Sequence, residues 1–190
     1  MKRKLKAGRS EALIVLSIVP TPMTPIIRFS QPSDIFPLTE IYNHYILNTA
    51  ITFDIKLFTV ERRTEEWFEH YSNSGRYRLL VAEVEKQVVG YASSSRFHAK
   101  AAYETSVETS VYVHPKATGK GVGSWLYSAL FNALKTEDVH RAYAGITLPN
   151  PASIALHQKF GFKSVGVYRE VGRKFDRYWD VEWFEKDLSE

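Results

Sequence analysis

The sequence has no cysteine among its 190 residues. This absence excludes a disulfide framework and a metal site built from thiolate ligands. The sequence also lacks any apolar stretch of the ~20 residues that a membrane-spanning helix needs. We therefore expect a chain stabilised by its apolar core, with no membrane association and a cytoplasmic location, and we assign no residue to a metal site.

An excess of positive charge is found only at the amino terminus. The chain has 25 Lys and Arg against 21 Asp and Glu, a formal net charge of +4. Residues 1–22 contain five basic residues and one acidic residue, so this short segment accounts for the whole excess. The remaining domain is neutral, which argues against an electrostatic surface for a phosphate backbone. We expect no nucleic-acid partner.

Residues 1–22 superficially resemble a signal peptide, because the basic residues precede an apolar run from Ala12 to Val19. This run is short for a signal peptide, it ends at Pro20, and no small-residue cleavage site follows. We interpret residues 1–22 as an extension, or as the result of an upstream start with Met23 opening the domain; secretion stays an alternative. The domain itself is predicted to span residues 23–190.

Apolar residues are abundant and follow alternating strand and helix patterns. They make up 44% of the chain, and aromatic residues 14%, which is enough to bury a core in one domain of this length. Hydrophobic periodicity and capping residues predict an α/β domain with a mixed sheet. The predicted strands cover residues 26–29, 77–84, 88–97, 105–113, 143–148, 162–167 and 178–184. The predicted helices follow Ser33-Asp34, Thr59 (with Trp67 and Tyr71 on one face), the glycines near residue 120, and Asn150.

The segment ATGKGVGSWL, residues 117–126, has glycines at alternate positions directly before residues that favour helix. A Walker phosphate loop needs G-x-x-x-x-G-K-[ST], but here Lys120 is followed by another glycine. A dinucleotide loop needs G-x-G-x-x-G, but counting from Gly119 the sixth residue is Ser124. The spacing therefore excludes both common nucleotide loops.

This glycine segment connects a predicted strand to a predicted helix. In that arrangement the loop amides and the positive end of the helix dipole point at one spot, which suits a pyrophosphate. Missing Cβ atoms would let such a ligand approach the backbone closely. The alternative, that the glycines only permit a turn from strand to helix, stays open.

The segment from Val111 to Leu134 resembles the acetyl-coenzyme A signature of the GNAT superfamily of N-acetyltransferases, written [QR]-x-x-G-x-[GA]. Thr118 departs from the first position of the motif, which removes a side-chain contact and leaves the backbone amides in place. The resemblance implies acetyl-CoA as cofactor and a mixed sheet of about six to seven strands with helices on both faces. The cofactor-binding residues that it implies are Val111, Tyr112, Val113, Thr118, Gly119, Lys120, Gly121, Val122, Gly123, Ser124, Asn150 and Ser153.

Three further stretches, AYETSVETSVYVHP, TLPNPASIALHQKFGF and VGRKFDRYWDV, are similar to stretches of the phosphinothricin N-acetyltransferase family. The similarity runs in the same order from about Ile26 to Leu188. It implies acetylation of a small amino acid or an analogue of the phosphinothricin, methionine sulfone or methionine sulfoximine type. It also implies a homodimer, for which the segment RYWDVEWF, residues 177–184, supplies apolar side chains.

Acetyl transfer to an amine needs a base, because amines with pKa values of ~8 to ~10 are mostly protonated at neutral pH. Glu108 is the only carboxylate between Thr105 and Glu137, and it lies on the strand leading into the glycine segment. Its family counterpart is the general base, so the resemblance implies this role for Glu108. The alternative is a glutamate that faces solvent or forms an ion pair. Flanking apolar residues favour burial, which would raise its pKa.

His157 lies in LHQKFGF, where many GNAT enzymes carry a tyrosine and the phosphinothricin relatives a histidine. The resemblance implies that His157 gives a proton to the departing thiolate, as imidazole can near neutral pH. The alternative is a helix histidine packed beside the sheet. Backbone amides from Val111 to Val113 are expected to stabilise the developing oxyanion. Asn150 is also satisfied as a helix N-cap.

The acceptor pocket is expected to hold the anionic groups of an amino acid. The family commonly carries R-x-R before an Ala-Tyr pair, and His98 and Lys100 occupy these positions here. One firm cation therefore stands where two are usual, and neither residue offers the planar fork of arginine. The expected substrate-binding residues are Phe53, His98, Lys100 and Tyr103. Trp67 is expected to belong to the core instead.

Two other functions stay open. An N-acetyltransferase for peptide N-termini or other amines would have a more open acceptor pocket. A non-catalytic coenzyme A-binding module would not need Glu108 and His157, so their presence argues against it.

Overall fold

The structure is a computed structural model of the chain and describes residues 24–189. The interpretation of residues 1–22 as an extension concerns positions outside this range and stays a prediction. The helices are α1 (Ile35–Asn48), α2 (Val60–Glu66), α3 (Val122–Leu134) and α4 (Pro151–Lys159). The strands are β1 (Ile26–Phe29), β2 (Leu79–Val84), β3 (Gln87–Arg96), β4 (Ser106–Val113), β5 (Arg141–Thr147), β6 (Lys163–Lys174) and β7 (Arg177–Asp187).

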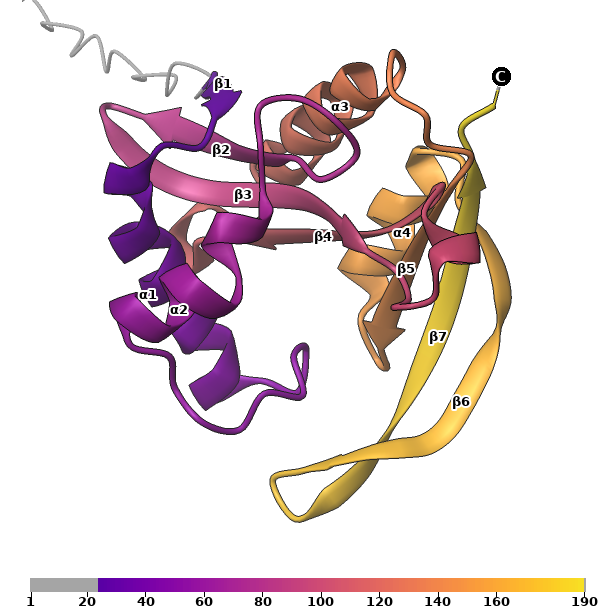
Figure 1. Ribbon diagram of the computed structural model, residues 1–190. Coiled ribbons are helices and arrows are strands. Elements are labelled where there is room, and N and C mark those ends of the chain that lie inside the picture. Colours follow the sequence, from indigo (N-terminus) through magenta and orange to yellow (C-terminus); the bar gives the residue numbers. More distant parts are fainter. Residues whose placement is uncertain (1–23, 190) are drawn as a thin grey trace, which may run out of the picture.

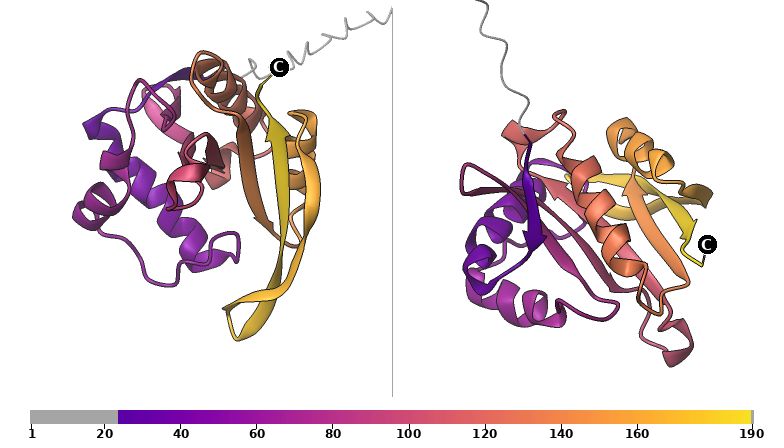
Figure 2. Two further views of the ribbon diagram at one scale, coloured as in Figure 1. Left: turned by 45° about the vertical axis from the view of Figure 1, so that its right-hand side comes forward. Right: turned by 90° about the horizontal axis from the view of Figure 1, so that it is seen from above.

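The strands form one mixed sheet in the order β1-β2-β3-β4-β5-β7-β6. Every neighbouring pair is antiparallel except β4 and β5, which run parallel. Helices α1 and α2 cover one face of the sheet, and α3 and α4 cover the other (Figures 1 and 2). The predicted fold class, a mixed sheet of six to seven strands with helices on both faces, is confirmed.

Each face of the sheet buries an apolar core. On the α3 side, one apolar face of α3 packs against the strands, and Leu126 and Leu130 are fully buried. On the α1 side, Leu38 and Ile41 pack against Tyr91. The larger core on the α3 side fixes the end of β4 relative to the start of α3, and so it positions the glycine segment between them.

Strands β6 and β7 are longer than the sequence predicts, since they extend well beyond residues 162–167 and 178–184. The register of this pair shifts between Ser164 and Gly166 and again between Tyr168 and Gly172. Such bulges interrupt the alternating pattern by which a strand is predicted. The resulting hairpin reaches beyond the rest of the sheet (Figure 1).

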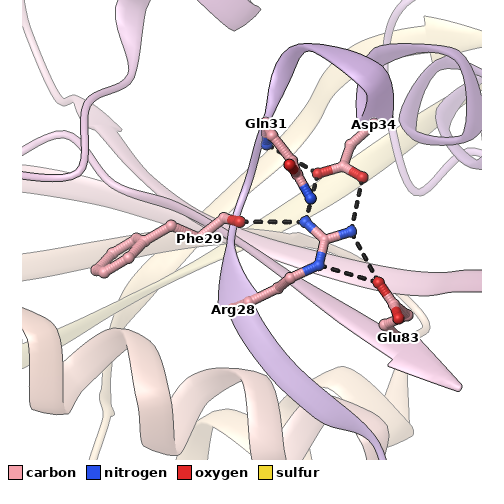
Figure 3. Close-up of polar contacts among 5 residues, drawn as sticks. All are labelled: Arg28, Phe29, Gln31, Asp34 and Glu83. Carbon is pink, nitrogen blue, oxygen red and sulfur yellow. Dashed lines mark hydrogen bonds and ion pairs between the residues drawn. The ribbon is translucent and has the colours of Figure 1, made fainter. Parts of the chain in front are cut away.

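Asp34 occupies the N-cap position of α1, as the sequence predicts, but its carboxylate does not cap that helix. The carboxylate instead accepts hydrogen bonds from Arg28 Nη1 and Nη2, at 2.7 and 2.8 Å, and from the Gln31 backbone N–H (Figure 3). Glu83 accepts from Nε of the same guanidinium at 3.0 Å. Arg28 on β1 therefore ties the start of α1 to β2.

Helix α2 begins where predicted, because the Thr59 hydroxyl accepts a hydrogen bond from the Arg62 backbone N–H at 3.2 Å. The helix ends at Glu66, so the prediction that Trp67 and Tyr71 lie on one of its faces is wrong. Both rings follow the helix and stack edge to face, with centroids 5.0 Å apart. They pack against the smaller core on this face, where Trp67 was expected.

Candidate active site

Strands β4 and β5 pair over only a short stretch before they separate. The pairs are Ser106 with Arg141, Val107 with Ala142, and Glu108 with Tyr143. Beyond Glu108, β4 continues to Val113 paired with β3 alone. The separation leaves a gap in the sheet, which contains a small cavity of about 50 Å³ lined by residues of both strands and by His157 of α4.

Glu108 stands at the mouth of this gap, on the α1 face of the sheet. Its half-buried side chain lines a cavity of about 510 Å³, which we call the acceptor cavity. Burial raises the pKa of the Glu108 carboxyl group above its ordinary value. Within residues 24–189 the carboxylate forms no ion pair, so the structure does not support the alternative of a salt-bridged glutamate.

The glycine segment forms a loop between β4 and α3 with two left-handed residues. Gly119 and Gly121 have φ values of 73° and 81°, and the space beyond each Cα is open. Gly121 is the N-cap of α3, and in the described chain the amide N–H groups of Val122 and Gly123 have no acceptor. This end of α3 therefore presents free donors and a positive dipole end to a ligand.

Gly123 has a packing role that distinguishes it from the other two glycines of the loop. A Cβ at this position would lie 3.0 Å from Leu156 Cδ2 of α4. Gly123 lies inside α3 and lets α3 and α4 approach each other, which is neither a turn nor an opening for a ligand.

A cavity of about 490 Å³, which we call the cofactor cavity, opens between the glycine loop, the end of β4 and α4. All the predicted cofactor-binding residues line it except Lys120, which points into a surface groove beside α1. Several other residues line it that were not predicted from the sequence: Tyr45, Ile51, Ala117, Ala152, Ala155, Leu156 and Lys159. Lys159 donates a hydrogen bond to Ser124 Oγ at 3.0 Å; its place in LHQKFGF, beside His157, is the one signal that could have found it.

His157 is buried at the inner end of the gap, with 3% of its surface exposed. Its Nδ1 lies 2.8 Å from the Ser153 backbone oxygen, and its Nε2 lies 2.8 Å from the Tyr127 hydroxyl. A carbonyl oxygen only accepts, so we assign the proton to Nδ1, and Nε2 accepts from Tyr127. Burial lowers the pKa of His157, which favours this neutral form.

Asn150 caps α4, because its Oδ1 accepts a hydrogen bond from the Ser153 backbone N–H at 3.1 Å. Both residues line the gap as well as the cofactor cavity. Ile51 also lines both, and it reaches the acceptor cavity too. It comes from the loop after α1, so no local motif marks it.

The predicted substrate-binding residues fall into two groups. Phe53 lines the acceptor cavity with Glu108 and packs against Gly172 of β6. His98, Lys100 and Tyr103 are exposed on the loop between β3 and β4 and line none of the three cavities described above. Tyr103 and His98 instead pack against each other, with ring centroids 4.9 Å apart.

Two structural findings bear on other classes of function. None of the helices within residues 24–189 is long and apolar enough to cross a membrane. The same part of the chain brings together no group of three or more His, Cys, Asp or Glu side chains that could hold a metal ion.

Comparison with known proteins gives the same family from sequence and from structure. Residues 27–183 match the family described as acetyltransferase (GNAT) domain. A phosphinothricin N-acetyltransferase of Streptomyces coelicolor is 56% identical over 164 residues, which cover 85% of this chain and 95% of the relative. An L-methionine sulfoximine/L-methionine sulfone acetyltransferase of Salmonella typhimurium is 37% identical over 164 residues, which cover 86% of this chain and 95% of the relative.

Among solved structures, the crystal structure of a GNAT superfamily phosphinothricin acetyltransferase from Sinorhizobium meliloti in complex with AcCoA is similar at a TM-score of 0.82. It is 32% identical, and the match covers 87% of this chain and 89% of that one. The family match over residues 27–183 includes most of the sheet, the gap and the glycine loop. The chain therefore belongs to the GNAT family of acetyl-CoA-dependent N-acetyltransferases.

Proposed function

We propose that this enzyme acetylates the α-amino group of a small amino acid or of an analogue of the phosphinothricin, methionine sulfone or methionine sulfoximine type. The observation that carries the proposal is the position of Glu108, at the point where the gap joins the acceptor cavity to the cofactor cavity. Relatives named as phosphinothricin and methionine sulfoximine acetyltransferases support the acceptor class.

The cofactor cavity fits acetyl-CoA. The left-handed Gly119 and Gly121 leave open space where side chains would otherwise stand, and the free N–H groups of Val122 and Gly123 suit phosphate oxygens. Lys159 adds a positive charge on the α4 side of the cavity. Acetyl-CoA supplies an activated acetyl thioester, and these residues would hold and orient it.

Glu108 would accept the proton of the acceptor's ammonium group, directly or through one water. A general base works best when its pKa lies near the working pH, and burial moves the pKa of Glu108 in that direction. Because no cation of the described chain pairs with the carboxylate, it is free to receive the ammonium group.

His157 and Tyr127 would hold a proton at the inner end of the gap. In the structure the proton on Nδ1 is bound by the Ser153 carbonyl oxygen, and Tyr127 donates to Nε2. Burial raises the pKa of the Tyr127 hydroxyl group, so the phenol itself is a poor proton source, and its hydrogen bond orients the imidazole. We therefore keep His157 as the proposed donor of a proton to the departing thiolate, with Tyr127 as the residue that positions it.

We also propose that the enzyme is a homodimer whose interface includes β6. This edge strand is exposed along nearly its whole length. Its exposed apolar side chains are Val165, Val167, Tyr168 and Val171. In the predicted interface segment, residues 177–184, Val181 and Phe184 are instead buried in the protein's own fold.

The experiment is a thiol-release screen with acetyl-CoA against free amino acids, phosphinothricin, methionine sulfone and methionine sulfoximine, with mass spectrometry of the products. We expect N-acetylation of at least one free amino acid or analogue. Peptides with free N-termini form a second arm. Activity on peptides alone, or thiol release without any acetylated product, would contradict the proposal.

A further inference from the structure

A second cavity on the α1 face, which we call the Arg63 cavity, adjoins the acceptor cavity. Its volume is about 640 Å³, and aromatic and hydroxyl side chains form most of its wall. The two cavities share Tyr42, Ser110 and Tyr112. A ligand bound beside Glu108 can therefore extend into the Arg63 cavity without crossing the sheet.

Arg63 is a buried cation on the wall of this cavity. It lies in the last turn of α2, and 4% of its surface is exposed. Its guanidinium carbon lies 3.9 Å from the ring centroid of Tyr42 and 3.9 Å from that of Trp67. Its one hydrogen bond within residues 24–189 runs from Nη2 to the Tyr91 hydroxyl, at a long 3.4 Å, and Nε is buried without a partner.

Nearby carboxylates do not neutralise this charge. Asp54 and Glu66 line the same cavity. Asp54 accepts a hydrogen bond from the Tyr42 hydroxyl, and Glu66 is paired with the exposed Arg62. A buried charge without a counter-ion is costly, so proteins normally pair it. Two aromatic rings hold Arg63 in place, and no carboxylate of the described chain pairs with it. Its guanidinium group is therefore available to bind an anion from solution.

We propose that Arg63 binds the acidic group at the far end of the acceptor's side chain. The inference rests on the proposed function, in which the amine lies beside Glu108. The Arg63 guanidinium stacks on Tyr42, and Tyr42 lines both the Arg63 cavity and the acceptor cavity that contains Glu108.

The arrangement of the two cavities indicates which anionic group Arg63 receives. The α-carboxylate of an amino acid is attached to the same carbon as the amine, so both groups lie in the acceptor cavity beside Glu108. A group that reaches Arg63 in the adjoining cavity lies at the other end of the side chain. The acceptor class is therefore an amino acid whose side chain ends in an oxygen-bearing acid, such as a phosphinate. Arginine binds such oxygens through its planar fork of donors.

The test compares Arg63→Met with the matched control Arg62→Met, which removes the neighbouring, exposed arginine. The acceptors are phosphinothricin, with a phosphinate at the end of its side chain, and norleucine, with an apolar end. Loss of a charge-assisted hydrogen bond should raise the KM of Arg63→Met for phosphinothricin about 10- to 100-fold, with kcat retained. The KM for norleucine should not change, and Arg62→Met should behave like the wild type.

Binding without turnover is measured separately, as the rise in melting temperature that phosphinothricin produces in the presence of coenzyme A. The wild type and Arg62→Met should show this rise and Arg63→Met should not. If the wild type acetylates no free amino acid but shows the rise, the proposed function fails and the anion site stands. An equal loss of activity on both acceptors, or unchanged phosphinothricin binding in Arg63→Met, overturns the assignment. Arg63→Lys, which keeps the charge without the fork, replaces the methionine variant if that one does not fold.

Discussion

Glu108 of β4 pairs with Tyr143 of β5, and this is the last residue pair before the two strands separate. The pairing fixes the backbone of Glu108 on both sides, because Ser95 of β3 faces it on the other edge. The carboxylate is therefore carried by a rigid element directly beside the gap. A site built on a strand in this way holds its geometry more closely than one built on a loop.

The first prediction concerns Glu108→Gln, which keeps the shape of the side chain but cannot accept the ammonium proton. We expect kcat to fall by about 10²–10⁴, the usual contribution of a general base, with unchanged calorimetric affinity for acetyl-CoA. The loss should shrink as the pH rises, because more of the amine is then already deprotonated. Glu104→Gln, at an exposed glutamate just before β4, is the control. Wild-type kcat/KM at neutral pH in Glu108→Gln would show that the proton leaves by another route.

The second prediction concerns the glycine loop and compares Gly121→Ala with Gly75→Ala. Both glycines have a left-handed backbone, with φ values of 81° and 83°, and open space beyond Cα. Both variants should lose a similar ~1–2 kcal/mol of stability, the cost of placing an L-residue in that conformation. Only Gly121→Ala should weaken acetyl-CoA binding, by about tenfold or more, as for a lost hydrogen bond to a charged group. Equal affinities in the two variants, measured by calorimetry, would remove the loop from the cofactor site.

The third prediction concerns the buried, neutral His157. Its folded-state pKa is lowered by burial, so the unfolded chain binds this proton more readily than the folded protein. Stability should therefore be lost as the pH falls below the ordinary histidine value of about 6.5. In His157→Gln this loss is absent, so the difference in melting temperature between wild type and variant should narrow from pH 7.5 to pH 5. His98→Gln, at an exposed histidine, should keep the wild-type pH dependence. Parallel melting curves for wild type and His157→Gln would contradict a neutral, buried imidazole.

The fourth prediction concerns β6 as a dimer interface. We expect sedimentation to show a dimer for the wild type, and a monomer when Val165→Lys and Val167→Lys are combined. Two charges in an apolar contact would oppose association. Leu47→Lys places the same charge on α1, at an apolar side chain that is likewise exposed, and should leave the dimer intact. A monomeric wild type, or a doubly substituted protein that still dimerises, would exclude this interface.

The parts of the site that could be predicted from the sequence are those with a local signal. The spacing of Gly119 and Gly121 marks the loop, and the single carboxylate of β4 marks Glu108. Ile51 and Arg63 carry no such signal, because tertiary packing brings them to the cavities. Ile51 lies in the loop that contains Thr52, and Lys174 holds this loop to β6. The Lys174 Nζ donates a hydrogen bond to the Thr52 carbonyl oxygen at 2.8 Å, although the two residues are 122 positions apart in the sequence.

The same contrast applies to the fold. Alternation, periodicity and capping residues together predicted the seven strands and the four α-helices of the described chain. The capping of the helices was less predictable, because another side chain can compete for a capping residue. The Asp34 carboxylate, for example, binds Arg28 and does not cap α1. The length of β6 and β7 was hidden by bulges that break the alternation. The substrate-binding role expected for His98 and Lys100 stays a prediction, because both residues are exposed and line none of the three cavities.

The gap between β4 and β5 also has a consequence for the kinetic order of the reaction. The glycine loop and α4 form most of the cofactor cavity, and residues of β4 to β7 form most of the acceptor cavity, so the two reactants in our proposal bind to different elements. Neither has to leave before the other arrives, and both can be bound at once. Double-reciprocal plots of initial rate should therefore give intersecting lines, which indicate a ternary complex, and not the parallel lines of a ping-pong exchange.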